Sequence, residues 1–161
     1  MAITLAVGDV APAFKLSDHA GETHSLADYR GRTVVLYFYP KDETPGCTKQ
    51  ACSLRDNHQD ILDKSAVVLG VSKDSAESHK TFVQNHSLPF SLLVDEEAAV
   101  AARYGAWGEK TLYGRTSIGM MRATFIIGPE GKIVRLWKRA KAAGHGEVVL
   151  KALHKLAGEA S

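Results

Sequence analysis

The chain has 161 residues, of which 45% are hydrophobic and 24% are charged, and its formal net charge is +2. This length and composition predict one globular domain, spanning residues 1–161, with enough apolar residues for a substantial core. The near-neutral balance argues against disorder and against nucleic-acid binding, since the longest basic run, residues 132–141, is no larger than a solvated strand edge. No apolar run approaches the roughly 20 residues of a membrane helix, so no membrane partner is expected.

The first residues, Met1 to Leu5, show no basic stretch followed by a long apolar segment, so no signal peptide is expected. We therefore expect a cytoplasmic location, where thiols are kept reduced. The chain contains two cysteines, Cys47 and Cys52. In a reducing compartment such a pair is more often catalytic than structural.

The first elements expected along the chain are a short hairpin and a single helical turn capped by Ser25. The hairpin pairs residues 13–16 with residues 23–25 around a turn-rich stretch. A continuous run of β-branched and aromatic residues over 33–39 then predicts a strand buried on both faces.

Beyond this strand, helical and strand patterns alternate. The elements expected in order are a helix over residues 47–64, a strand over 66–71, a helix capped by Ser75, a strand over 90–94 and a helix capped by Asp95. Residues 105–121 are interpreted as an irregular loop in which Trp107 and Tyr113 pack. Two strands over 122–127 and 132–137, joined by a glycine-proline turn, and a helix over 146–156 complete the chain.

This order predicts an α/β sandwich with a mixed central sheet, flanking helices and an N-terminal β-hairpin extension. The early strands take parallel crossovers, and the late hairpin adds antiparallel strands. The order is similar to that of the thioredoxin-like architecture.

Cys47 is expected in the first turn of a helix, because it follows a buried strand and a turn containing Pro40 and Pro45. The unpaired N–H groups and the positive dipole end at such a position favour the thiolate, which is the nucleophilic form of cysteine. Pro45 restricts Thr44 to an extended conformation, from which its hydroxyl can reach Cys47 or the reaction partner of Cys47. Pro40 lacks an N–H group and can pack over the thiol, which limits the water around it.

Cys52 lies five residues after Cys47. In a regular helix these positions are about 140° apart and separated by about 7.5 Å of rise. The Cα atoms of a disulfide are rarely more than about 6.8 Å apart, so the two cysteines can bond only if the helix unwinds locally. Taken alone, the cysteines could equally be small buried hydrophobic residues, but the Thr-Pro-Gly-Cys turn after a buried strand favours the reactive interpretation.

The pattern Pro40-x-x-x-Thr44-x-x-Cys47 resembles the active-site motif of the peroxiredoxins. Three segments resemble in particular the peroxiredoxin Q branch, also called bacterioferritin comigratory proteins: Tyr37-Phe38-Tyr39-Pro40-Lys41-Asp42, Thr44-Pro45-Gly46-Cys47-Thr48 and Ala51-Cys52. The similarity continues through residues 68–75, 88–90, 104–110 and 122–125, in the same order along the chain.

The resemblance implies a thiol peroxidase that reduces hydrogen peroxide and organic hydroperoxides without a cofactor. Cys47 would be the peroxidatic cysteine that forms a sulfenic acid, and Cys52 the resolving cysteine that converts it to an intramolecular disulfide. Thioredoxin would then reduce the disulfide. Thr44 and Arg122 would bind the peroxide oxygens and Pro40 would shield the site, in a protein expected to be a monomer. A fixed guanidinium favours the thiolate and stabilises charge on the departing oxygen.

The chain departs from the branch at Gln50 and at Gly128. Gly128 replaces an acidic residue common at the end of the strand that starts at Arg122, and this change affects only the hairpin. Gln50 stands where the branch usually has glutamate, which removes a negative charge one turn after Cys47 and is expected to tune reactivity. Some members resolve through a cysteine on the following helix, but the chain has no cysteine after Cys52, so resolution uses Cys52 or an external thiol.

His79 and His86, seven residues apart on one expected helix, are interpreted as solvated, and no metal site is predicted.

Two other functions remain open. A thioredoxin-like protein-disulfide oxidoreductase usually carries Cys-x-x-Cys, a pair that can bond without unwinding. A non-enzymatic redox sensor or holdase would use the same disulfide to switch a partner surface. Thioredoxin-coupled peroxide turnover separates the peroxidase from both.

Overall fold

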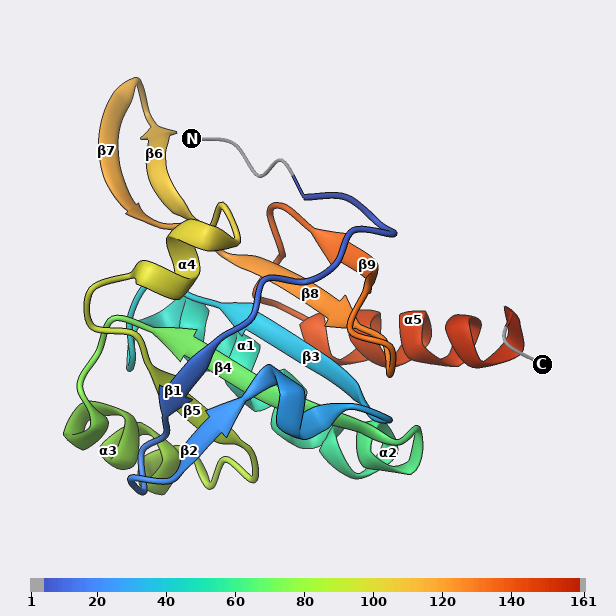
Figure 1. Ribbon diagram of the computed structural model, residues 1–161. Coiled ribbons are helices and arrows are strands. Elements are labelled where there is room, and N and C mark those ends of the chain that lie inside the picture. Colours follow the sequence, from blue (N-terminus) through green and yellow to red (C-terminus); the bar gives the residue numbers. More distant parts are fainter. Residues whose placement is uncertain (1–4, 160–161) are drawn as a thin grey trace.

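The computed structural model describes residues 5–159, and a mixed sheet of order β5-β4-β3-β8-β9 forms its centre (Figure 1). The bounds of these strands are β3 (Thr33–Phe38), β4 (Ala66–Ser72), β5 (Ser91–Val94), β8 (Ala123–Ile127) and β9 (Ile133–Trp137). β3 and β5 both pair with β4 in parallel, whereas β8 pairs antiparallel with β3 and β9. The predicted mixed α/β sheet, with parallel early strands and an antiparallel late hairpin, is confirmed.

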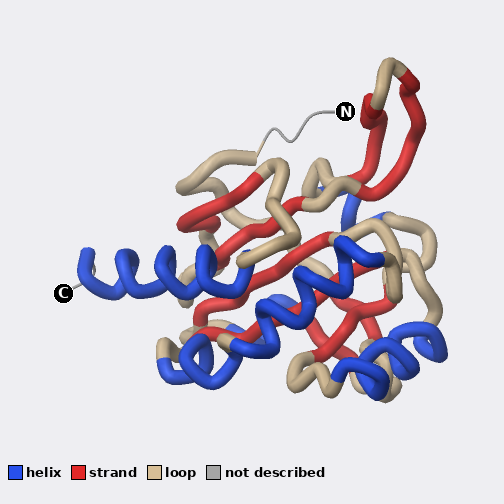
Figure 2. The backbone as a smooth tube through the Cα atoms, turned by 180° about the vertical axis from the view of Figure 1, so that it is seen from behind, coloured by secondary structure: helices blue, strands red, loops and turns tan. Residues whose placement is uncertain are grey.

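Helices cover both faces of the sheet. One face carries α1 (Pro45–Asp56), α2 (His58–Asp63), α3 (Ala76–His86) and α5 (His145–Glu159), which lie in front of the strands in Figure 2. The other face carries α4 (Ala99–Arg103), the predicted hairpin of β1 (Lys15–Ser17) and β2 (Thr23–Ser25), and the 3-10 turn η1 (Leu26–Tyr29), as Figure 1 shows. No helix of residues 5–159 is long and apolar enough to cross a membrane.

The two faces have separate hydrophobic cores because the side chains of β3 alternate between them. Val34, Leu36 and Phe38 belong to the core under α4 and the N-terminal segment. Val35 and Tyr37 belong to the core under α1, α3 and α5, which also contains Cys47. β3 leads into residues 40–47, which we call the cysteine turn, and the strand is therefore held from both sides.

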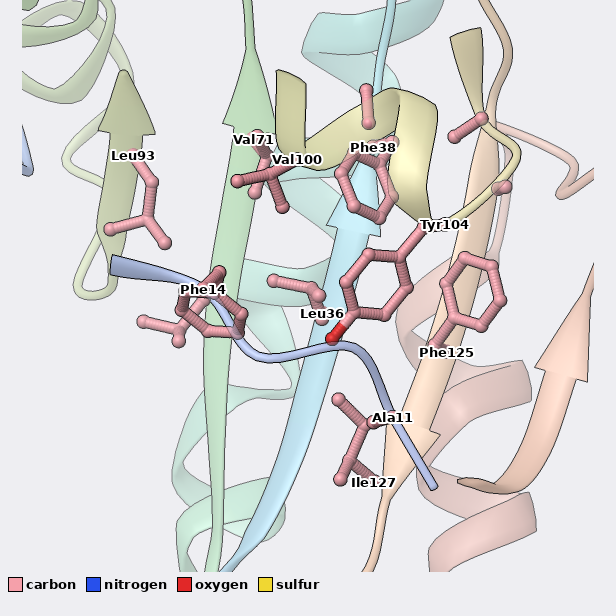
Figure 3. Packing of buried hydrophobic residues seen from close by; sticks show 14 of the residues in the cluster. Ala11, Phe14, Leu36, Phe38, Val71, Leu93, Val100, Tyr104, Phe125 and Ile127 are labelled. Carbon is pink, nitrogen blue, oxygen red and sulfur yellow. The ribbon is translucent and has the colours of Figure 1, made fainter. Parts of the chain in front are cut away.

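Tyr104 joins the N-terminal segment to the first of these cores. Its ring lies between Phe38 and Phe125 (Figure 3), with centroid distances of 5.3 and 5.1 Å. Its hydroxyl points towards the N-terminal segment and donates a hydrogen bond of 2.6 Å to the carbonyl of Pro12. A buried tyrosine needs such a partner, and here the partner fixes the segment that crosses the sheet.

Ser75 caps its helix as predicted, whereas the helix predicted to begin at Asp95 begins later, with Ala98 as the cap of α4. The Ser75 side chain accepts a hydrogen bond of 3.1 Å from the Ser78 N–H at the start of α3. The Asp95 carboxylate accepts from the N–H groups of Val100 and Ala101 at 3.3 and 2.9 Å. Both side chains satisfy backbone donors that a helix leaves unpaired at its start.

The helix predicted over residues 47–64 is two helices, because the chain bends at Asn57. Asn57 has φ −106° and ψ 5°, outside regular helical values. Its side-chain amide donates to the carbonyl of Ser53 at 2.9 Å. An asparagine that competes in this way for a helix carbonyl favours a helix end. The continuous helix was a wrong prediction, although α1 still contains both cysteines.

The irregular loop predicted over residues 105–121 is also wrong, because β6 (Trp107–Leu112) and β7 (Arg115–Met120) form an antiparallel hairpin. The hairpin projects from the body of the molecule (Figure 1). Its turn consists of Tyr113 and Gly114, with φ values of 53° and 76°, and two positive φ values match the twist of a two-residue hairpin. Tyr113 is 95% exposed, so its expected packing role is wrong as well.

Candidate active site

Cys47 is the third residue of α1 and is 1% exposed. The preceding Thr44 is extended, with φ −75° and ψ 151°, and Pro45 is the first helical residue, as predicted. The Thr44 carbonyl accepts the first helical hydrogen bond, from the Thr48 N–H at 2.8 Å. The thiol therefore lies in the turn where backbone N–H groups lack helical partners and where the helix dipole favours negative charge.

Arg122 reaches this thiol from a position 75 residues later in the chain. It directly precedes β8, which pairs with β3, and its carbonyl accepts from the Ala140 N–H at 2.8 Å. Its Nη2 lies 3.5 Å from the Cys47 Sγ. Among residues 5–159 no carboxylate forms an ion pair with Arg122. The guanidinium charge therefore acts on the thiol without a neighbouring anion to neutralise it.

Two neighbours set the position of this guanidinium. Arg122 Nη1 donates to Gln50 Oε1 at 2.8 Å, and Gln50 is fully buried. A Cβ on Gly46 would lie 3.0 Å from Arg122 Nη2, so the absence of a side chain at this position leaves room for the guanidinium. The sequence reasoning noted Gln50 only as a departure and missed Gly46, whose one signal was its place directly before the cysteine.

Buried polar atoms without a partner lie close to the cysteine turn. Among the described residues, the Gln50 Nε2 and the Tyr37 hydroxyl are buried and have no hydrogen-bond partner. Burial, followed by the negative charge that Cys47 carries as a thiolate, raises the pKa of Tyr37 well above its usual value. Tyr37 is therefore a neutral phenol packed in the same core as Cys47.

Pro40 and Thr44 belong to the turn that precedes Cys47 in the chain. The Thr44 hydroxyl donates to the Lys41 carbonyl at 2.9 Å. Because the hydroxyl proton is used in this bond, the Thr44 oxygen can act only as an acceptor towards another group. Pro40 and Arg122 both line a cleft of about 730 Å³, together with Met120, Met121 and residues of the β6–β7 hairpin. The structure thus brings Arg122 beside Cys47 and places Pro40 in the cleft that Arg122 lines. Thr44 lies just before the helix that carries Cys47, and its hydroxyl contacts Lys41. The roles of all four residues stay predictions.

Cys52 lies further along the same helix and is half-buried. Both thiols are free. Because α1 is helical from Pro45 to Asp56, the separation expected for positions five residues apart applies to Cys47 and Cys52, and they cannot bond in this conformation. The disulfide itself stays a prediction.

A buried network anchors the cysteine turn through Asp42. The Asp42 carboxylate accepts from the Tyr39 hydroxyl at 2.5 Å and from the Ser78 hydroxyl at 2.8 Å. Its Oδ2 also lies 2.7 Å from Nδ1 of His79, which is fully buried. The interpretation of His79 as a solvated residue was wrong, because the partner that buries it comes from a different part of the chain. The network fixes the turn to β4 and α3.

The network contains the one group of metal-ligand atoms near the turn within residues 5–159, formed by Asp42, Asp74 and His79. Each of these side chains already has a protein partner. Asp74 Oδ2 accepts from the Asp42 N–H and from the Ser72 hydroxyl, and His79 Nε2 lies 2.8 Å from the Leu93 carbonyl. The residues therefore act as a hydrogen-bonded anchor.

Comparisons with known proteins identify the family of the chain. Residues 7–136 match the AhpC/TSA family, and the fold is that of the thioredoxin-like peroxiredoxins. The chain therefore belongs to the AhpC/TSA family of peroxiredoxins. Within that family it is similar to the branch named Bcp or peroxiredoxin Q, as the sequence predicts.

The relatives match over nearly their whole length. "Peroxiredoxin Bcp" of Bacillus subtilis is 43% identical over 151 residues, which cover 94% of this chain and 96% of that protein. "Peroxiredoxin Bcp" of Escherichia coli is 44% identical and covers 91% and 94%. The solved bacterioferritin comigratory protein of Xanthomonas campestris has a TM-score of 0.86 at 34% identity, covering 96% and 99%. A cysteine mutant of Xylella fastidiosa PrxQ has a TM-score of 0.88 at 35% identity, covering 95% and 98%.

Proposed function

We propose that the chain is a thiol peroxidase that reduces hydrogen peroxide and organic hydroperoxides through Cys47, with Cys52 as the resolving cysteine and thioredoxin as the reductant. The observation that carries the proposal is the Arg122 guanidinium 3.5 Å from a buried thiol in the first turn of α1. The family membership supports peroxidase activity. The solved bacterioferritin comigratory protein of Xanthomonas campestris is described as having alkyl peroxide reduction activity, which supports the same reaction here.

In the first step, the Cys47 thiolate attacks one peroxide oxygen and the O–O bond breaks. The sulfur becomes a sulfenic acid, and the departing oxygen takes a proton and leaves as water or an alcohol. Arg122 stabilises the thiolate and the negative charge that develops on the departing oxygen. The Thr44 oxygen accepts a hydrogen bond from the peroxide, because its own proton is engaged by Lys41. Pro40 shields the site from water.

In the second step, α1 unwinds locally and the Cys52 thiolate attacks the sulfenic sulfur. The S–O bond breaks, hydroxide takes a proton and leaves as water, and the 47–52 disulfide forms. A dithiol then reduces the disulfide by two exchange reactions. We propose thioredoxin as this dithiol. The disulfide lies within one chain, and α1 must already be unwound where the disulfide forms.

The test is stopped-flow peroxide consumption with thioredoxin, thioredoxin reductase and NADPH, for the wild type, Cys47→Ser and Cys52→Ser. We expect Cys47→Ser to lose peroxide consumption entirely. Cys52→Ser should oxidise once at a rate near that of the wild type and then fail to turn over. Near-wild-type turnover by Cys47→Ser would contradict the assignment, and a mass map of the oxidised wild type without a 47–52 disulfide would contradict the resolving role.

An insulin-reduction assay, added to these measurements, addresses the two alternatives. A protein-disulfide oxidoreductase would reduce insulin disulfides and would not require peroxide. A redox sensor or holdase would form the disulfide once, without catalytic reduction by thioredoxin. The intact helix between Cys47 and Cys52 favours the peroxidase, because a disulfide oxidoreductase works with a pair that can bond directly.

We also propose that the protein works as a monomer in the cytoplasm and binds neither nucleic acid nor membranes. The net charge of +2 supports the absence of nucleic-acid binding, and a single pair of cysteines is typical of a reducing compartment. Light scattering of the reduced protein is expected to give the mass of one chain at micromolar concentration. A dimer mass that persists on dilution would contradict the monomer.

A further inference from the structure

Helices α1 and α5 lie against each other on the face that carries the cysteines (Figure 2). Their polar contacts are made by Ser53 and Asn57 at the end of α1 and by Gly146 and Glu147 at the start of α5. We call these residues the α1–α5 clamp. Ser53 directly follows Cys52 in the chain, so the clamp grips α1 next to the proposed resolving cysteine.

The clamp consists of hydrogen bonds that tie Ser53, in the last turn of α1, and Asn57, the residue directly after α1, to the start of α5. The Ser53 hydroxyl accepts from the Gly146 N–H at 2.8 Å and donates to Glu147 Oε2 at 3.2 Å. The Asn57 amide donates to Glu147 Oε1 at 3.3 Å and to the Ser53 carbonyl at 2.9 Å. The bond from Asn57, followed by a backbone bond of Glu147 and the bond from Ser53, lowers the pKa of Glu147. Glu147 is therefore an anion at neutral pH.

The two backbones also touch at this point. A Cβ on Gly146 would lie 2.1 Å from the Ser53 carbonyl oxygen and 2.8 Å from Asn57 Nδ2. Real side chains do not approach backbone this closely, so the contact requires glycine. Ser53 therefore cannot shift towards α5, and it cannot move away from α5 without breaking the clamp.

This arrangement bears on the second step of the proposed function, on which the inference rests. The unwinding that brings Cys47 to Cys52 removes the helical bonds of the turn that precedes Ser53, including the one its own N–H makes. We propose that the clamp holds Cys52 in the helix and sets the cost of that unwinding, so that Ser53, Asn57 and Glu147 are positioning residues for disulfide formation.

The clamp therefore divides the Cys47 sulfenic acid between two fates. Attack by Cys52 gives the disulfide and water. Attack on a second peroxide transfers one oxygen to the sulfur and gives sulfinic acid, with water or an alcohol as the other product. A tighter clamp delays Cys52 and leaves more time for the second peroxide, whereas a weaker clamp favours the disulfide.

The matched variants are Glu147→Ala, Ser53→Ala and a control, Glu77→Ala. Glu147→Ala removes the two carboxylate oxygens that accept from Ser53 and Asn57 and leaves the sequence of α1 unchanged. Ser53→Ala removes the hydroxyl from the other side. Glu77 is an exposed acidic residue in the first turn of α3, as Glu147 is in α5, so its substitution has a similar effect on the helix dipole without touching the clamp.

Three quantities are measured at pH 7. Rapid quench and mass spectrometry give the rate of 47–52 disulfide formation after one equivalent of peroxide. The same method gives the sulfinic fraction of Cys47 at high peroxide. Iodoacetamide labelling gives the reactivity of Cys52 in reduced protein that carries Cys47→Ser. We expect both clamp variants to form the disulfide and to label Cys52 roughly two- to fivefold faster than the control, with a smaller sulfinic fraction.

A purely structural role would lower the stability to urea without changing these rates. Disulfide formation, Cys52 labelling and sulfinic fraction equal to those of the Glu77→Ala control would therefore overturn the inference. The labelling uses no peroxide, so it decides the role of the clamp even if the wild type forms no 47–52 disulfide. A wild type without a 47–52 disulfide contradicts the proposed function, whereas the labelling result alone decides the role of the clamp.

Discussion

The buried histidine at the start of α5 makes stability depend on pH. His145 is 2% exposed, and its Nε2 lies 2.9 Å from the Thr124 hydroxyl. Its ring meets the face of Trp137 at a centroid distance of 5.7 Å. Burial, and secondly the positive charge of Arg122, lower the pKa of His145 from 6.5 to about 4. The folded protein therefore keeps this ring neutral where the unfolded chain would protonate it.

The sign follows from the number of bound protons. Between pH 6.5 and about 4 the unfolded chain binds the proton at His145 and the folded protein does not. Stability from this group is therefore complete above pH 6.5 and falls as the pH falls to about 4, below which both states are protonated. At about 1.4 kcal/mol per pH unit the loss amounts to about 3 kcal/mol. This is a large part of a typical stability of about 5–15 kcal/mol.

The assay is urea unfolding at pH 7.5 and pH 4 for the wild type, His145→Gln and His154→Gln. Glutamine places a nitrogen near that of Nε2, so the contact to Thr124 has a replacement. His154 is an exposed histidine of the same helix and serves as the control. We expect the wild type and His154→Gln to lose about 3 kcal/mol more than His145→Gln between the two pH values. Equal losses in all three proteins would refute the reasoning.

Two further substitutions test the core and the anchor of the cysteine turn by urea unfolding at pH 7.5. Gly70→Ala is expected to cost about 1–3 kcal/mol by overpacking, since its Cβ would lie 2.7 Å from the Leu92 side chain; an unchanged midpoint would show that the core yields. Asp42→Ala leaves the buried Tyr39 hydroxyl and the buried His79 ring without their carboxylate acceptor, so we expect a loss of about 1–3 kcal/mol and slower peroxide consumption. As a control, Glu43→Ala removes the partly exposed contact between the Glu43 carboxylate and His86. This substitution should cost less than about 1 kcal/mol. A similar loss in both variants would contradict the importance of burial.

Sequence reasoning succeeded where local patterns determine the structure. β3 was predictable because every residue from Val34 to Phe38 is apolar or aromatic, as expected of a strand with two covered faces. The start of α1 was predictable because Pro45 restricts the residue before it and cannot lie deeper in a helix. Arg122 is different, because its approach to Cys47 depends on the pairing of β8 with β3, and only the family resemblance indicated it.

Two of the wrong predictions concern the β6–β7 hairpin and His79. Both depend on features that the local sequence pattern does not show. The β6–β7 hairpin has no alternating apolar pattern, and Gly108 faces Gly119 across its strands, so neither strand has the usual signal. The spacing of His79 indicates which helix face it occupies but not what that face meets. Its burial comes from Asp42, which is 37 residues earlier.

The alternation along β3 also assigns its side chains to two different cores. Side chains at 34, 36 and 38 belong to the core that contains Tyr104, and those at 35 and 37 to the core that contains Cys47. Repacking the first set is expected to change the resistance of the fold to heat without replacing a side chain of the core that contains Cys47. Substitutions at 34, 36 and 38 therefore act on the Tyr104 core, and substitutions at 35 and 37 act on the core that contains Cys47.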